Sequence, residues 1–135
     1  MPLVTISEAK ETVIMSIKVL IVDDSASMRQ QLKFTLQKNA DFDVLEAEDG
    51  RDALDKVNAN ADIKVIISDV NMPEMNGIEF LEAMHEKGLS IPTVMLTTTG
   101  EVSLITRAKA AGAKGWMVKP FDPQKIVKVI RTLAG

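Results

Sequence analysis

Near its start the chain reads Lys18-Val19-Leu20-Ile21-Val22-Asp23-Asp24, a short β-branched apolar run that stops at two acidic residues. Residues 65–67 and 93–96 form similar runs, and each is followed by polar residues. Their continuous rather than alternating apolarity indicates strands that are buried on both faces, as in a parallel sheet. Residues 44–47 and 115–118 are weaker strand candidates.

The segments between these runs have the length and apolar spacing of amphipathic helices. The first carries Met28, Leu32 and Leu36 at intervals of four. Four more are marked by apolar residues three or four apart, within residues 53–57, 78–84, 102–108 and 126–133. Side chains that commonly cap helix N-termini precede three of the five: Ser25, Asn76, and Asp122 followed by Pro123.

Strand and helix therefore alternate five times along the chain. Strict alternation of this kind implies the α/β class, with a parallel sheet, helices on both faces and right-handed crossovers. Five units are too few for an eight-stranded barrel, so we expect an open, doubly wound five-stranded sheet of the flavodoxin-like type. Ligands of such sheets bind just beyond the carboxyl ends of the strands.

Composition narrows the class of protein. A chain of 135 residues with 46% apolar residues suits a single domain with a well-filled core. The absence of cysteine excludes disulfides and thiolate sites, and a single histidine, His85, excludes a polyhistidine metal site. No apolar run approaches the roughly 20 residues of a membrane helix, and the N-terminus lacks the pattern of a signal peptide. We expect a soluble, cytoplasmic protein without a membrane partner.

Charge is distributed unevenly along the chain. Residues 1–100 carry nine Lys/Arg and seventeen Asp/Glu, whereas residues 101–135 carry seven Lys/Arg and two Asp/Glu. We expect the acidic part to hold a cation and the basic part to contact a partner protein. Nucleic acid is a poor fit, because the basic part offers only Trp116 and Phe121 for stacking on bases.

Residues 1–15 lie outside the alternating pattern. We interpret them as an N-terminal extension, either a flexible arm with a short helix at 7–15 or a stretch ahead of a start at Met15. The domain itself is expected to span residues 16–135.

Polar residues follow four of the five predicted strands. They are Asp23-Asp24, Asp69, Thr97-Thr98 and Lys119-Pro120. Any one of them alone is most often a helix cap, a turn or a solvated loop residue. The carboxyl ends of parallel strands meet at one edge, however, so the predicted fold brings all four groups together.

The chemistry of this set points to phosphate and a hard cation. Clustered carboxylates repel one another unless a cation joins them, and oxygen ligands without His or Cys favour Mg²⁺. Lys119 and the Thr97 hydroxyl can contact phosphoryl oxygens, and a carboxylate can accept a phosphoryl group as an acyl phosphate.

The same residues resemble the CheY-like receiver domain of two-component response regulators. The run Asp69-Val70-Asn71-Met72-Pro73-Glu74-Met75-Asn76-Gly77 is similar to the D-x-x-M-P-x-M-x-G phosphorylation loop of that family. Residues 23–29 resemble its acidic start, and residues 110–116 its approach to the fifth strand. The resemblance covers residues 16–135 and implies the strand order 2-1-3-4-5.

The resemblance also implies a role for each site residue. Asp69 would be the phosphoacceptor. Mg²⁺ would be held by Asp24, by Asp69 and by the backbone carbonyl of Asn71, with Asp23 acting through a metal-bound water.

Two further positions on the later strands complete the implied site. Thr97 would contact the phosphoryl group, and Lys119, before a cis bond to Pro120, would pair with another phosphoryl oxygen. Trp116 stands at the switch position, where Tyr or Phe is usual, and its indole N–H needs a partner. Thr99 replaces a common acidic residue, which leaves the lifetime of the phosphate undetermined.

The function implied is a stand-alone signalling switch without an enzyme's turnover, expected to be monomeric. A CheA-like histidine kinase would supply the phosphate, and the output would be a protein such as a flagellar motor switch protein in chemotaxis. A phosphorelay intermediate is an alternative. An aspartyl-phosphate phosphohydrolase is disfavoured because such enzymes place D-x-D after the first strand, whereas Asp23 and Asp24 are adjacent and no second acid follows Asp69 at two residues. An FMN protein is disfavoured because Asp23-Asp24 would repel the phosphate.

Several other residues have predicted places. Lys125, Lys128 and Arg131 are spaced by three along the last helix and form a candidate docking stripe, or an ordinary solvated face. His85 falls near the end of the third helix, where a cation favours the dipole. The four phenylalanines, Phe34, Phe42, Phe80 and Phe121, are predicted in the core or at its rim.

Overall fold

The structure, a computed structural model, describes residues 16–135. The predicted extension at residues 1–15 and its candidate helix lie outside the described residues. Strands and helices alternate as predicted, in the order β1 (Ile17–Val22), α2 (Ala26–Gln37), β2 (Phe42–Ala47), α3 (Gly50–Ala59), β3 (Ile63–Ser68), α4 (Gly77–Glu86), β4 (Thr93–Thr97), α5 (Val102–Ala110), β5 (Gly115–Val118) and α6 (Pro123–Ala134).

The five strands form one parallel sheet in the order β2-β1-β3-β4-β5. The chain runs outward from β1 to the edge strand β2, returns to β3 on the other side of β1, and then continues through β4 to β5. This reversal between β1 and β3 confirms the doubly wound α/β fold. It also creates the switch point outside which ligands bind in such sheets.

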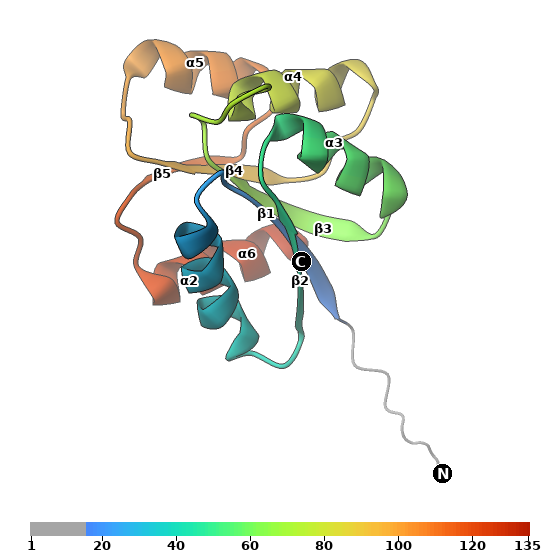
Figure 1. Cartoon of the computed structure of the whole chain (residues 1–135), viewed down its shortest axis with the longest axis vertical. Helices are drawn as coiled ribbons and strands as arrows, with labels where there is room; N and C mark the ends of the chain where they lie inside the picture. The colour runs from blue at the N-terminus through green and yellow to red at the C-terminus, as the bar shows by residue number, and fades with distance from the viewer. Residues whose placement is uncertain (1–15) are drawn as a thin grey trace.

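Helices cover both faces of the sheet (Figure 1). The α2 and α6 helices pack on one face, and α3, α4 and α5 pack on the other. Successive residues of β1 enter opposite cores: Val19 and Ile21 face α2 and α6, whereas Leu20 and Val22 face the other three helices. Because both sets are buried, the strand is apolar without alternation.

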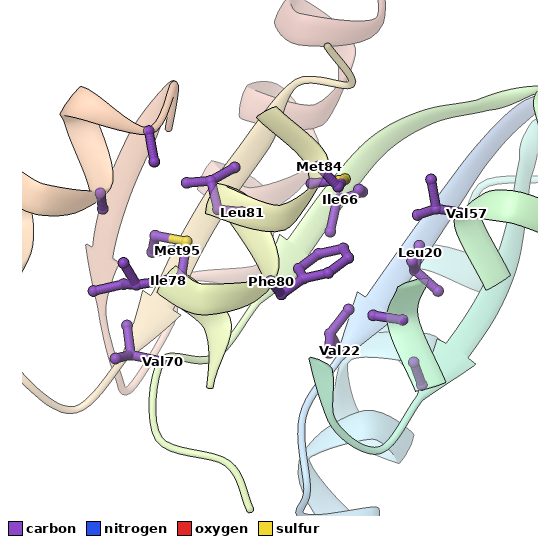
Figure 2. Packing of buried hydrophobic residues seen from close by; sticks show 14 of the residues in the cluster. Leu20, Val22, Val57, Ile66, Val70, Ile78, Phe80, Leu81, Met84 and Met95 are labelled. Carbon is purple, nitrogen blue, oxygen red and sulfur yellow. The ribbon is translucent and has the colours of Figure 1, made fainter. Parts of the chain in front are cut away.

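The larger core fills the space between the sheet and the α3, α4 and α5 helices. Figure 2 shows Phe80 of α4 projecting between the sheet and α3, with Leu20 and Val57 beside it. Met84 and Met95 are almost fully buried in this cluster, where flexible methionine side chains fill gaps in the packing. Among residues 16–135, no helix combines the length and apolarity needed to cross a membrane.

The predicted helix caps are confirmed. The Ser25 hydroxyl accepts a backbone N–H at the start of α2, and Asp122 does the same for α6, with Pro123 in the first turn. Asn76 and Glu79 form a reciprocal capping box at the start of α4. The Asn76 cap therefore begins α4 at the end of the predicted phosphorylation loop.

One phenylalanine prediction is wrong, because Phe34 is 68% exposed. Leu32 and Leu36 form the buried face of α2, which packs on the sheet, and position 34 lies on the opposite face of the helix. The Lys38 ammonium lies 4.8 Å from the centre of the Phe34 ring and partly covers it. The other three lie where predicted: Phe42 and Phe80 are buried, and Phe121 packs at the core rim.

Candidate functional site

Three carboxylates meet at the carboxyl edge of the sheet. Asp23 and Asp24 follow β1, and Asp69 follows the neighbouring β3. One oxygen from each lies within 4.8 Å of the other two. The sequence-based expectation that these groups lie together is therefore confirmed in geometry.

Lys119, one residue beyond the end of β5, reaches across the edge to this cluster. Its Nζ lies 2.8 Å from Oδ2 of Asp23 and 3.3 Å from Oδ2 of Asp69. Burial, the largest single influence, lowers the pKa of the Lys119 ammonium, but the hydrogen bond to Asp23 and the charges of Asp69 and Asp23 outweigh it. The pKa is raised overall, so Lys119 supplies a permanent positive charge. The peptide bond to Pro120 is cis, as predicted.

The three carboxylates have different surroundings. Asp23 is 2% exposed, and its Oδ1 accepts a 2.9 Å hydrogen bond from the backbone N–H of Ser25. Asp69 is partly buried, and its Oδ1 accepts a 2.7 Å bond from the N–H of Val70. Asp24 is exposed, and within residues 16–135 its carboxylate forms no hydrogen bond or ion pair. Asp24 is thus the carboxylate best able to turn toward a ligand from solvent.

This donor set fits a hard divalent cation. Among residues 16–135, the ammonium of Lys119 is the one that forms ion pairs with the three carboxylates, and it pairs with Asp23 and Asp69 but not with Asp24. Oxygen donors with excess negative charge are the ligands that Mg²⁺ or Ca²⁺ prefers in proteins. Asn71, two residues after Asp69, is exposed.

Two glycines shape the loop between β3 and α4. A Cβ on Gly77 would lie 2.0 Å from the backbone oxygen of Asp69, so only glycine lets α4 begin this close to the site. A Cβ on Gly50 would lie 2.6 Å from Met75, whose carbonyl accepts the Gly50 N–H at 3.0 Å. Sequence reasoning gave neither glycine a role, although Gly77 stands in the quoted loop motif.

Thr97 and Trp116 occupy neighbouring strands and meet the same loop. Thr97 is fully buried at the end of β4, and its hydroxyl lies 3.5 Å from the backbone N of Thr99. Trp116, on β5, donates a 2.9 Å hydrogen bond from its indole Nε1 to the Thr99 carbonyl. The predicted partner of the indole N–H is therefore the backbone carbonyl of Thr99. Thr99 connects the side chains of Thr97 and Trp116.

Of the three residues predicted to form a basic stripe on α6, Arg131 is paired with an acid, and Lys125 and Lys128 are exposed. Arg131 donates two hydrogen bonds to the Asp41 carboxylate, at 2.6 and 3.1 Å, and its guanidinium also stacks over the Phe42 ring. Its charge therefore anchors α6 to the segment before β2. Lys125 and Lys128 are exposed and line a groove of about 440 Å³ with Lys114. His85 lies in the last turn of α4, as predicted, and is exposed.

Comparison with known proteins gives a consistent result. The response regulator receiver domain family matches residues 19–131. The chemotaxis protein CheY1 of Helicobacter pylori is 42% identical over 120 residues, covering 87% of this chain and 97% of that protein. Chemotaxis protein CheY of Bacillus subtilis is 35% identical over 116 residues, covering 86% and 96%.

Solved structures agree with the sequence relatives. Chemotaxis protein CheY4 of Vibrio cholerae superposes with a TM-score of 0.80 at 45% identity, covering 87% of this chain and 98% of the other. In a complex of CheX with CheY, BeF₃ and Mg from Borrelia burgdorferi, the matching chain gives a TM-score of 0.79 at 30% identity, covering 86% and 87%.

Proposed function

Because this chain belongs to the response regulator receiver domain family, we propose that it is a chemotaxis switch whose phosphoacceptor is Asp69. The observation that carries the proposal is the position of the Asp69 carboxylate. It lies beside the carboxylates of Asp23 and Asp24 at the switch point of the sheet. Its Oδ2 is 3.3 Å from Nζ of Lys119. A nucleophilic oxygen, a cation site and a fixed positive charge are the groups that phosphoryl transfer to a carboxylate requires.

In the proposed reaction a carboxylate oxygen of Asp69 attacks the phosphorus atom of a phosphohistidine. A bond from this oxygen to phosphorus forms, the bond from phosphorus to the imidazole nitrogen breaks, and the imidazole leaves as the donor's histidine. Lys119 offsets charge on the phosphoryl oxygens. Thr97, buried at the end of β4, supplies a hydroxyl that can donate to one of them.

The proposed metal is Mg²⁺. Asp24, Asp69 and the Asn71 carbonyl would hold it, and Asp23 would contact one of its water ligands. When bound, the ion neutralises charge that develops on the transferring phosphoryl group. The solvent-facing carboxylate of Asp24 supports this role, since it has no competing partner among the described residues.

Output is proposed to pass through the loop after β4. Thr97 and Trp116 both contact Thr99, so a Thr97 hydroxyl that turns toward a phosphoryl group changes the surroundings of the indole. Trp116 also lines a groove of about 190 Å³ with Lys109 and Lys114. The switch and the basic surface are therefore adjacent.

The proposed partner surface lies between α5, β5 and α6. Lys114 lines both the groove beside Trp116 and the groove beside Lys125 and Lys128. Lysines beside an apolar floor suit an acidic, partly apolar protein segment. We propose a CheA-like histidine kinase as the phosphate donor and a flagellar motor switch protein as the target. The proposed location is the cytoplasm, and the proposed domain is a monomer that spans residues 16–135.

The chemotaxis relatives favour this switch over a phosphorelay intermediate. We propose a regulator that is phosphorylated and later returns to its unphosphorylated form, and not an enzyme that turns over phosphomonoesters. The Borrelia burgdorferi neighbour is a CheY in complex with CheX, which supports a second class of protein partner for this chain.

The direct test is phosphorylation by a small acyl phosphate with Mg²⁺, followed by intact-mass measurement. The parent chain should gain one phosphoryl group, and the gain should disappear with EDTA. Asp69→Asn should gain none, whereas Asp55→Asn, on the exposed face of α3, should behave as the parent. Equal phosphorylation of Asp69→Asn would refute the assignment.

A further inference from the structure

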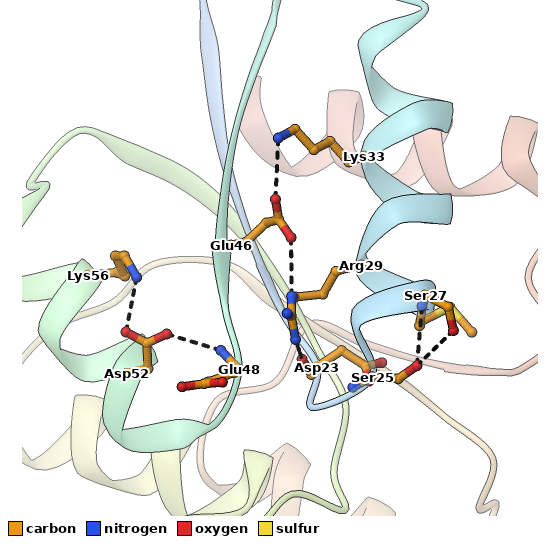
Figure 3. A network of polar contacts seen from close by, with 10 residues as sticks. Asp23, Ser25, Ser27, Arg29, Lys33, Glu46, Glu48, Asp52 and Lys56 are labelled. Carbon is orange, nitrogen blue, oxygen red and sulfur yellow. Dashed lines mark hydrogen bonds and ion pairs between the residues drawn. The ribbon is translucent and has the colours of Figure 1, made fainter.

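Arg29, one turn into α2, links the loop after β1 to strand β2 (Figure 3). Its Nη1 donates a 2.6 Å hydrogen bond to the backbone carbonyl of Asp23, and its Nε donates a 3.1 Å bond to Oε1 of Glu46. Only 18% of the Arg29 side chain is exposed, so water competes weakly for these bonds. Because a guanidinium presents its donors in a rigid plane, the two contacts fix each other's direction.

The residue held in this way is central to the acidic cluster. The backbone N–H of Asp23 donates to the Ala47 carbonyl at 3.1 Å, and its carboxylate accepts from Ser25 and Lys119. Arg29 completes the set by holding the backbone carbonyl. That carbonyl belongs to the peptide unit that joins Asp23 to Asp24.

Asp24 depends on this peptide unit more than the other acids do. Within the described residues its carboxylate has no hydrogen bond or ion pair of its own, so its position is set by the backbone that carries it rather than by side-chain contacts. The plane of a peptide is rigid, and turning the Asp23 carbonyl turns the N–H of Asp24 with it. An anchor on that carbonyl therefore limits where the Asp24 carboxylate can point.

We infer that Arg29 is a positioning residue for the acidic site: it fixes the peptide plane between Asp23 and Asp24 and so preorganises both carboxylates for a divalent cation. The inference rests on the proposed metal site and adds a residue that touches neither the cation nor the phosphoryl group. Removal of groups that orient metal ligands typically weakens metal binding by about 10–100-fold.

The chain offers a matched control for the charge. Lys33 lies 3.3 Å from Oε2 of the same Glu46, on the same helix, but makes no contact with Asp23 (Figure 3). Arg29→Gln and Lys33→Gln each remove one positive charge and one ion pair to Glu46. Only Arg29→Gln also removes the bond to the Asp23 carbonyl.

The experiment is calorimetric titration of the full-length chain with Mg²⁺ alone, at fixed pH and ionic strength, with melting curves in EDTA to verify folding. Arg29→Gln should raise the dissociation constant about tenfold or more, and Arg29→Lys should recover only part of the loss. Lys33→Gln should stay within about twofold of the parent. An unchanged constant in folded Arg29→Gln, or an equal loss in Lys33→Gln, would overturn the inference.

A second variant covers the case in which Arg29→Gln does not fold. Glu46→Gln keeps Arg29 but weakens its anchor, and it should raise the dissociation constant by a smaller factor. No change in that variant would count against positioning. A parent chain that binds no Mg²⁺ would overturn the proposed metal site together with this inference, whereas normal binding by both parent and Arg29→Gln would overturn the inference alone.

Discussion

The indole N–H of Trp116 lies 2.9 Å from the backbone carbonyl of Thr99, to which it donates a hydrogen bond. The backbone N of the same Thr99 lies 3.5 Å from the hydroxyl oxygen of Thr97. Because the chain has one tryptophan, the fluorescence of Trp116 reports on this loop without a label.

Phosphorylation should change the emission of Trp116. The expected cause is a movement of the Thr97 hydroxyl toward the phosphoryl group, which alters the loop that holds the indole. Adding a small acyl phosphate with Mg²⁺ to the parent chain should shift the fluorescence intensity or wavelength, and Asp69→Asn should show no shift. Thr97→Val, which keeps the side-chain volume but lacks the hydroxyl, should accept phosphate with a reduced fluorescence response. A full response in phosphorylated Thr97→Val would exclude the coupling.

Mg²⁺ should raise the melting temperature of the parent chain through Asp24. An ion that binds only the folded state stabilises it by about 1.4 kcal/mol at ten times its dissociation constant. Asp24→Ala should lose most of this increase and should also melt higher than the parent in EDTA, because one repelling carboxylate is gone. Asp55→Ala serves as the control for a lost surface charge. A normal Mg²⁺ response in Asp24→Ala would argue that the ion binds elsewhere.

Gly77→Ala should destabilise the fold and disturb the site. The added Cβ would lie 2.0 Å from the Asp69 carbonyl and 2.8 Å from the Met95 methyl group, so backbone has to move. A cost on the order of 2–3 kcal/mol is expected in chemical denaturation, together with slower phosphorylation of Asp69. Gly100→Ala is the matched control, since nothing lies within 4 Å of its Cβ position. Similar unfolding free energies for both variants would show that the loop adapts freely.

Reversal of charge on α6 should slow binding of an acidic partner. Lys125→Glu combined with Lys128→Glu leaves the site loops unchanged, so phosphorylation of Asp69 should proceed at the parent rate. Association should become slower and less sensitive to salt, because electrostatic attraction acts mainly on the encounter rate. Stopped-flow binding at several ionic strengths measures both effects. Parent-like kinetics would return these lysines to ordinary solvated surface.

The ion pair between Arg131 and Asp41 should make a small, pH-dependent contribution to stability. The hydrogen bond from Arg131 is the main cause of the lowered pKa of Asp41. A carboxyl whose pKa is lower in the folded state stabilises the fold above its unfolded value, near 3.8, and loses this effect as pH falls through the folded value. Arg131→Gln should therefore melt slightly below the parent at pH 7, with a smaller difference below pH 3.8. Lys128→Gln is the control, and a pH-independent difference would contradict the prediction.

The central strands were predictable from sequence because both of their faces are buried. The β1, β3 and β4 strands are buried over nearly their whole length and read as continuous apolar runs. The β2 and β5 strands at the sheet edges are half-buried, which explains their weaker signal. The acidic cluster followed from the same pattern, because parallel strands end at one edge.

Other features depend on contacts between distant segments and left no local signal. Arg131 was predicted in the docking stripe because its ion pair with Asp41, ninety residues away in sequence, could not be foreseen. The hydrogen bond from Arg29 to the Asp23 carbonyl depends on the conformation of the Arg29 side chain, and the spacing of apolar residues does not predict that conformation. The error on Phe34 is of another kind: the spacing of Met28, Leu32 and Leu36 already places position 34 on the outer side of α2, and the prediction followed the apolarity of Phe34 instead.

The parallel sheet also has an engineering consequence. Loops that lead into the strands lie at the edge opposite Asp69, and Gly88, before β4, has open space around its Cβ position. Exposed loop tips of this kind are where inserted domains are usually tolerated. A fluorescent reporter inserted at Gly88 would lie away from the phosphorylation chemistry, so the tagged chain should still accept a phosphoryl group on Asp69.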